Sequence, residues 1–205
     1  KLAKKDGDAL SGRKPIMYNN DVVVIICRPE KQMDYFYKNT LCDEVFFIHE
    51  GSGTLESQLG YMKFKEGDYI VIPRGIIYRL VHDTDEARYL IFETTGPITT
   101  PSRYRNEFGQ LMEHSPYCER DLKGPEEMVT IDKKGDFIVK VKKGEQIVSF
   151  HYEFHPLDVV GWDGYYFPWI FNIEDFMPIT GKIHMPPPIH QTFAANGFVI
   201  CSFCP

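Results

Sequence analysis

Short apolar runs rich in β-branched and aromatic residues recur through the first half of the chain, and turn residues separate them. A typical run is Asp21–Arg28 (DVVVIICR), which polar residues bound on both sides. Runs of roughly four to eight such residues predict buried strands. The runs without helical periodicity lie at about residues 21–28, 34–38, 43–49, 54–58, 61–64, 69–72, 76–82 and 88–93. This spacing predicts a mainly β fold, either a sandwich or a barrel.

The remainder of the chain divides by composition. The start is polar and basic, without an apolar pattern, and residues 94–130 are rich in Pro, Thr and Arg, with one short helix expected at Glu107–Glu113. Strand-like runs return at 137–141, at 147–154 and within 192–203, and the aromatic segment between them is broken by Gly and Pro. The expected units are an arm (1–20), a β unit (21–93), a surface connection (94–130) and an additional β-rich segment (131–205).

Composition narrows the class of protein. The chain has 205 residues, of which 43% are hydrophobic and 25% charged, so it can bury a core without disulfides. A net charge of −6 without a basic cluster argues against a nucleic-acid partner, and no apolar run is long enough to cross a membrane. The five cysteines, an odd number, predict reduced thiols and a cytoplasmic protein. Because the chain lacks an initiator Met and ends in a strand-like run (FVICSFCP), we expect it to be part of a longer protein.

The segment Thr40–Leu80 carries the spacing that specifies the fold. Glu44 leads a strand, and a Gly-rich turn and a Gly-(x5)-Pro-x-Gly pattern follow it. The turn residues are Gly51, Gly53, Gly67, Pro73 and Gly75. Glycine permits the positive φ of tight corners, and proline ends a strand without needing a ladder donor. This arrangement resembles the cupin double motif, so we expect a cupin-like β-sandwich or barrel with additional strands, long irregular connections and few short helices.

The cupin-like unit is not expected to bind a metal. The resemblance implies that a metal-binding cupin has two His separated by one residue before the Glu, and a further His after the Pro-x-Gly. Those positions are Lys38, Thr40 and Tyr78 here, and only Glu44 remains of the set. An ammonium group and a hydroxyl do not replace imidazoles around iron or zinc. We therefore predict a scaffold without metal, in which Glu44 forms a salt bridge or caps a hairpin.

The other candidate ligands form no strong constellation. His151 and His155 lie four apart in a strand context, which places them on one side of the strand and leaves a metal pair open as an alternative. Cys201 and Cys204 form a CxxC without the second pair of a zinc site, so core packing is expected. Surface, polar or loop-ordering roles are expected for His49, His82, His114, His184 and His190. No catalytic, cofactor-binding or metal-binding residue is assigned in this chain.

Three blocks of sequence resemble the homogentisate 1,2-dioxygenase family. They are EVFFIHEGSGTLESQLG, EGDYIVIPRGIIYRL and HPLDVVGWDGYYFPWIFNIEDFMPI, and the last, with Asp158, Gly161–Gly164 and Asn172, is the most distinctive. The resemblance implies oxidative opening of the homogentisate ring by dioxygen to maleylacetoacetate, in tyrosine and phenylalanine catabolism. It also implies a non-haem Fe(II) held by two His and one carboxylate in a C-terminal cupin half. No position of this chain matches those ligands.

The resemblance therefore predicts that the chain is the N-terminal portion of such an enzyme. The complete enzyme would use Fe(II), an aromatic substrate and O₂, and would form a homo-oligomer, whereas the chain alone would bind no iron and be inactive. A metal-free cupin-like binding or scaffold module is the alternative. A metal cupin of another kind, such as an isomerase, is disfavoured by the missing His-x-His. The sequence after Pro205 would separate these alternatives.

Overall fold

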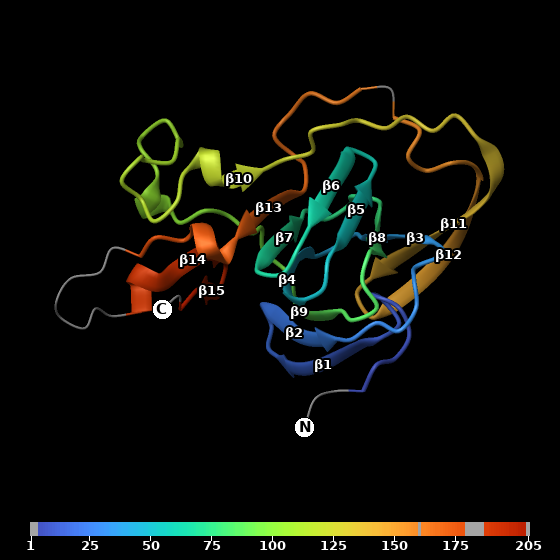
Figure 1. Cartoon of the computed structure of the whole chain (residues 1–205), viewed down its shortest axis with the longest axis horizontal. Helices are drawn as coiled ribbons and strands as arrows, with labels where there is room; N and C mark the ends of the chain where they lie inside the picture. Colours follow the sequence, from blue (N-terminus) through green and yellow to red (C-terminus); the bar gives the residue numbers. More distant parts are fainter. Residues whose placement is uncertain (1–3, 160, 179–186, 204–205) are drawn as a thin grey trace.

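The computed structural model describes residues 4–159, 161–178 and 187–203, and its mainly β architecture confirms the predicted fold class (Figure 1). Two large sheets face each other, and a small hairpin lies to one side of them. The first sheet has the strand order β1 (Arg13–Tyr18), β2 (Val22–Cys27), β9 (Arg88–Thr94), β4 (Asp43–Glu50), β7 (Asp68–Ile72), β13 (Trp169–Asn172) and β10 (Leu122–Lys123). All of its neighbours are antiparallel.

The second sheet combines the central strands with a long hairpin from later in the chain. Its order is β12 (Gln146–Phe154), β11 (Lys134–Lys143), β3 (Phe36–Asn39), β8 (Tyr78–His82), β5 (Gly53–Ser57) and β6 (Gly60–Phe64). Strands β11 and β3 run parallel, whereas the other neighbours are antiparallel. A separate hairpin consists of β14 (Gln191–Ala195) and β15 (Phe198–Cys201). The helices are short 3₁₀ turns: η1 (Ser102–Tyr104), η2 (Glu119–Asp121), η3 (Ile173–Asp175) and η4 (Pro187–His190).

The main core lies between the two sheets and follows the two-residue period of the strands. On β5, Leu55 is fully buried while its neighbours Thr54 and Glu56 are half-buried. The same alternation places Phe46 and Ile48 of β4 in the interior. Side chains at every second position point to the same face of a sheet, so one face of each strand fills the core.

A second core covers the outer face of the first sheet. Strand β7 is buried at all five positions, because Ile70 and Ile72 face the main core while Tyr69 and Val71 face the second one. This second core also contains buried side chains from the chain after residue 97: Ile98, Tyr104, Tyr117, Phe171, Phe176, Phe193 and Ile200. The prediction that residues 94–130 are a surface connection is therefore wrong for the buried aromatic residues of that stretch.

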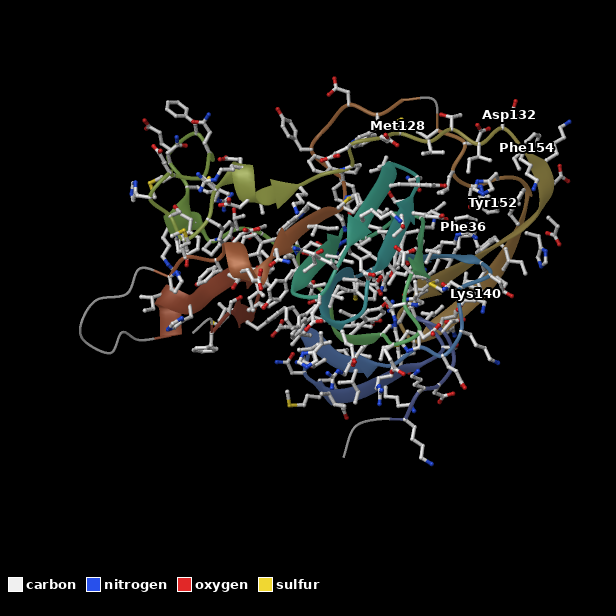
Figure 2. The ribbon with its side chains drawn as sticks, in the orientation of Figure 1. Phe36, Met128, Asp132, Lys140, Tyr152 and Phe154 are labelled. Carbon is white, nitrogen blue, oxygen red and sulfur yellow. The ribbon has the colours of Figure 1, made fainter. Side chains whose placement is uncertain are left out.

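A third, smaller core fixes the long hairpin. Phe36 of β3, Val139 of β11 and Leu157 are buried together, and Tyr152 of β12 packs against them. Figure 2 shows Phe36 and Tyr152 at the end of the molecule where β11 and β12 curve around β3. The register of the parallel pair places Lys142 opposite Asn39. This pairing brings a late segment of the chain alongside β3.

Three sequence predictions are corrected by the structure. Residues 13–18 lie in the predicted arm but form β1, an edge strand paired with β2. The predicted helix at Glu107–Glu113 is absent, because the Asn106 side chain accepts from the Phe108 and Gln110 backbone amides and closes a turn. Gly109, with φ of +85°, stabilises that turn because glycine tolerates positive φ. Strands β10 and β13 also occur where irregular structure was expected.

In the described residues, no helix has the length and apolarity needed to cross a bilayer. Cys27, Cys42, Cys118 and Cys201 are free thiols.

Burial predicts unequal reactivity of these thiols. Cys27 is 1% exposed, and burial raises its pKa to about 12. Since the thiolate is the nucleophile, we expect iodoacetamide at mildly alkaline pH to modify Cys27 only after unfolding. Peptide mass mapping of native and urea-unfolded protein measures this, with the half-buried Cys118 as the internal control. Modification of native Cys27 as fast as Cys118 would contradict the packing described above.

Candidate functional site: a buried charge cluster in the barrel

Two carboxylates lie directly opposite each other inside the barrel. Glu44 of β4 and Glu93 of β9 are cross-strand partners, and their side chains are 1% and 4% exposed. Like charges placed directly opposite on a sheet destabilise it, and buried carboxylates need compensating charge. Cations must therefore lie beside this pair in the interior of the fold.

Arg13 of β1 supplies the first cation. Its Nη1 donates to Glu44 Oε1 at 2.6 Å and to Glu93 Oε1 at 2.9 Å, so one guanidinium nitrogen bridges both carboxylates. The Arg13 side chain is only 8% exposed. Burial by itself would lower the pKa of Arg13, but the attraction of Glu44 above all raises that pKa well above its usual value. The guanidinium is therefore permanently charged.

Two buried phenols complete the contacts of Glu44. Tyr78 donates its O–H to Glu44 Oε2 at 2.5 Å and accepts from Arg13 Nη2 at 3.1 Å, while Tyr37 donates to Glu44 Oε1 at 3.3 Å. Burial raises the pKa of both phenols far above the ordinary value, with the charge of Glu44 adding to the effect. Both side chains therefore remain neutral hydrogen-bond donors. The rings of Tyr37 and Phe46 also face the Arg13 guanidinium, each with its centroid 5.2 Å from Cζ.

Lys142 supplies the second cation. Its Nζ donates to Glu93 Oε2, and its side chain is 21% exposed. Two backbone contacts hold this residue in place, because Thr40 donates both its N–H and its hydroxyl to the Lys142 carbonyl. The cluster of Arg13, Glu44, Glu93 and Lys142 thus contains two positive and two negative charges and is neutral. The term charge cluster refers below to these four residues.

The donor set of the charge cluster does not fit Fe(II). Glu44 is the single residue that matches a cupin metal ligand, and the groups around it are a guanidinium and two phenols. Fe(II) sites of this class use imidazoles together with a carboxylate. The Arg13 guanidinium already bonds both Glu44 and Glu93.

A short loop before β1 positions Arg13. The Asp8 carboxylate accepts from the backbone amides of Leu10 and Ser11, each at 2.8 Å, and from the Tyr35 hydroxyl at 2.8 Å. Arg13 Nε in turn donates to the carbonyl of Ala9 at 2.9 Å. Asp8 therefore fixes the loop whose backbone orients the guanidinium.

The residues at the motif positions of the sequence lie in different environments in the structure. Tyr78 lies in the interior beside Glu44, and the predicted salt bridge of Glu44 is confirmed. The inward position on β3 belongs to Tyr37, whereas Lys38 is half-buried and Thr40 bonds the Lys142 carbonyl. Sequence reasoning missed Arg13, Glu93, Lys142 and Tyr37.

The histidine pair has separate environments. His151 is exposed and its Nδ1 lies 2.7 Å from Asp136 Oδ1, whereas His155 is buried between the rings of Phe36 and Phe137. Across residues 4–159, 161–178 and 187–203, no group of three or more His, Cys, Asp or Glu side chains is placed to hold a metal ion.

The remaining candidates are dispersed. His82 was expected to be exposed but is half-buried, because its ring stacks on Tyr89 and its Nδ1 lies 2.5 Å from the Tyr89 hydroxyl oxygen. His49 is exposed, and His114 lines a surface cavity of about 230 Å³ with Arg103 and Tyr104. His190 packs on Phe203, and Cys201 is half-buried. His184 and Cys204 lie outside the described residues.

The Asp8 contacts predict a pH-dependent contribution to stability. Burial alone would raise the pKa of Asp8, but its hydrogen bonds with Ser11, Leu10 and Tyr35 lower that pKa below the ordinary value. The ionised form therefore adds stability above the unfolded-state pKa of about 3.9, and this is lost as pH falls through the lower folded-state pKa. We expect Asp8→Asn to lower the free energy of unfolding by about 1–2 kcal/mol at neutral pH. Urea titrations over a pH series should show the difference shrinking in acid, and a pH-independent difference would contradict this account.

The charge cluster predicts a large cost for loss of one carboxylate. Glu44→Gln keeps the shape but leaves Arg13 and Lys142 with a single buried counter-charge, so the free energy of unfolding should fall by about 3–5 kcal/mol. Glu56→Gln is the matched control, because Glu56 pairs with Arg79 at 2.5 Å on the same fold but with an arginine side chain that is 30% exposed. The control should lose less than about 1 kcal/mol. Equal losses in urea unfolding would mean that the charge cluster has no special weight.

Comparison with known proteins agrees with this architecture. Residues 9–173 match the family model described as homogentisate 1,2-dioxygenase N-terminal. The chain is 39% identical over 205 residues to the "Putative dioxygenase" of Saccharolobus solfataricus, covering 98% of this chain and 52% of that protein. It is 27% identical over 163 residues to homogentisate 1,2-dioxygenase of Bradyrhizobium diazoefficiens, covering 78% of this chain and 35% of the enzyme. The chain therefore spans about half, or about a third, of the length of these relatives.

Two solved structures overlap part of this chain. A cupin-2 domain protein of Shewanella frigidimarina overlaps 40% of this chain and 78% of its own, with 22% identity and a TM-score of 0.36. The cupin domain of Schizosaccharomyces pombe Cnp3 overlaps 40% of this chain and 63% of its own, with 13% identity and a TM-score of 0.38. The match over residues 9–173 covers most of the chain and shows that the chain belongs to the homogentisate 1,2-dioxygenase N-terminal family.

Proposed function

We propose that this chain is the N-terminal portion of a non-haem Fe(II) ring-cleaving dioxygenase that converts homogentisate and O₂ to maleylacetoacetate. The family match over residues 9–173 and the relatives named homogentisate 1,2-dioxygenase support the reaction class. The observation that carries the division of labour is the charge cluster, in which Arg13 bonds the cupin carboxylate Glu44. On this proposal, the iron ligands belong to polypeptide outside these 205 residues.

The role proposed for the present residues is structural support of the catalytic half. In the complete protein, bound iron would orient the phenolate substrate and O₂ and stabilise developing charge. The substrate is an aromatic hydroxy acid, and the pathway is tyrosine and phenylalanine catabolism. A homo-oligomer in the cytoplasm is part of the same proposal.

One observation favours a second candidate, a metal-free cupin-like binding or scaffold module. The charge cluster in the barrel interior is neutral, and Arg13 bonds both of its carboxylates. A module of this kind would need no iron anywhere in the protein. Metal analysis of the complete native protein separates the two candidates, since only the dioxygenase requires iron.

Oxygen uptake tests the proposed division of labour. The 205-residue chain with homogentisate and added Fe(II) should consume no O₂ above the rate of the same solution without protein. The complete protein, loaded with Fe(II), should consume O₂ and release a ring-opened product in equal amounts. Turnover by the 205-residue chain would overturn the assignment of the iron site. Failure of the complete, iron-loaded protein to turn over homogentisate would overturn the assignment of homogentisate as the substrate.

A further inference from the structure

The contacts of Arg13 inside the barrel match the shape of a guanidinium as well as its charge. Two carboxylates accept from one edge of the Arg13 group, the Tyr78 oxygen accepts from the neighbouring nitrogen, and the rings of Tyr37 and Phe46 face it. A planar, delocalised cation with several donors suits such a site, because it can bond at its edges and stack at its faces. A compact ammonium or a metal ion is also attracted to aromatic faces, but it lacks the planar fork of donors that bonds several acceptors along one edge.

Charge balance also selects the ligand. Without Arg13, the carboxylates of Glu44 and Glu93 and the ammonium of Lys142 would leave a net charge of −1. A monovalent cation would restore neutrality, whereas a divalent metal would leave a net charge of +1 in a buried place. Buried sites disfavour uncompensated charge. The site is therefore matched to one monovalent planar cation.

The residues that surround the Arg13 guanidinium lie on other strands than Arg13 itself. Glu44, Glu93, Tyr37 and Tyr78 come from β4, β9, β3 and β8, each of which has strand neighbours on both sides. Arg13 lies on β1, an edge strand whose pairing with β2 shifts register between Pro15 and Met17. The residues that follow on this strand, Ile16, Met17 and Tyr18, are 51%, 63% and 83% exposed. The four residues around the guanidinium therefore lie on interior strands of the two sheets, whereas Arg13 itself lies on an edge strand.

We propose that the barrel interior is a binding site for guanidinium cations, that Arg13 is its resident ligand, and that a free alkylguanidinium takes the site when the Arg13 side chain is truncated. The chemical class of ligand is a monovalent alkylguanidinium. This site is separate from the proposed dioxygenase chemistry and stands or falls independently of it.

Chemical rescue tests the proposal. Arg13→Ala removes the side-chain atoms beyond Cβ, which ethylguanidinium supplies. We expect low millimolar ethylguanidinium to stabilise Arg13→Ala saturably, lowering the unfolding equilibrium constant about tenfold at a concentration of about ten times its Kd. Ethylammonium, tetramethylammonium, Mn(II) and Zn(II) at matched ionic strength should each have less than a twofold effect. Isothermal titration calorimetry should give one binding site per chain.

Three controls make the rescue specific. Wild-type protein, whose site is filled, should not be stabilised by ethylguanidinium. Arg74→Ala should not be rescued, although Arg74 Nε also bonds a carboxylate, that of Asp43, at 2.9 Å, because its side chain is 34% exposed. The double variant Arg13→Ala with Glu93→Gln should lose the rescue, since one of the two carboxylates of the site is neutral.

The outcomes that overturn the proposal are definite. Absence of rescue, equal rescue by ethylammonium, or equal rescue of Arg74→Ala would each show that the interior does not select a guanidinium. Stronger stabilisation by Mn(II) or Zn(II) would make it a divalent-metal site. If Arg13→Ala does not fold alone, the measurement becomes the yield of refolding from urea. Ethylguanidinium should then raise that yield and ethylammonium should not, and no difference between them would overturn the proposal.

Discussion

The fold is organised around the two carboxylates that face each other on β4 and β9. Their positions in the register make Glu44 and Glu93 direct neighbours, and their burial removes the water that would screen them. Such a pair raises the free energy of the folded state unless cations reach it, and a cation reaching it must leave water as well. The cluster is favourable only as a complete set, with Arg13, Lys142 and the two tyrosines in place.

The need for cations beside Glu44 and Glu93 connects two segments that lie at the edges of the sheets. Arg13 comes from the first strand, at the edge of one sheet, and Lys142 from the β11–β12 hairpin, which lies at the edge of the other (Figure 1). Both bond the same carboxylate, that of Glu93. The cluster thus links both sheets through a single residue, and the second and third cores then fix the rest of the later chain by apolar packing.

Sequence patterns predict the strands well, because an apolar run between turn residues expresses a local constraint. The central strands from β2 to β9 lie close to their expected positions. The cluster itself escaped prediction because it depends on long-range pairing. Arg13 lies in a polar stretch with no apolar alternation, and Lys142 lies just outside the strand-like run predicted at 137–141. One residue of register on β3 decides that Tyr37 rather than Lys38 faces inward, and no local pattern fixes that register.

A guanidinium and a metal ion can both bridge carboxylates, but only a metal ion can also offer coordination positions to a substrate. A catalytic metal keeps coordination positions open for substrate and accepts electron density as a Lewis acid, whereas a guanidinium has fixed donors and no acceptor orbital at ordinary energies. In this barrel, the bridging nitrogen of Arg13 bonds both carboxylates and the neighbouring one bonds Tyr78. The Glu44 carboxylate therefore acts as a structural cross-link, because it accepts from Arg13 of β1, Tyr37 of β3 and Tyr78 of β8.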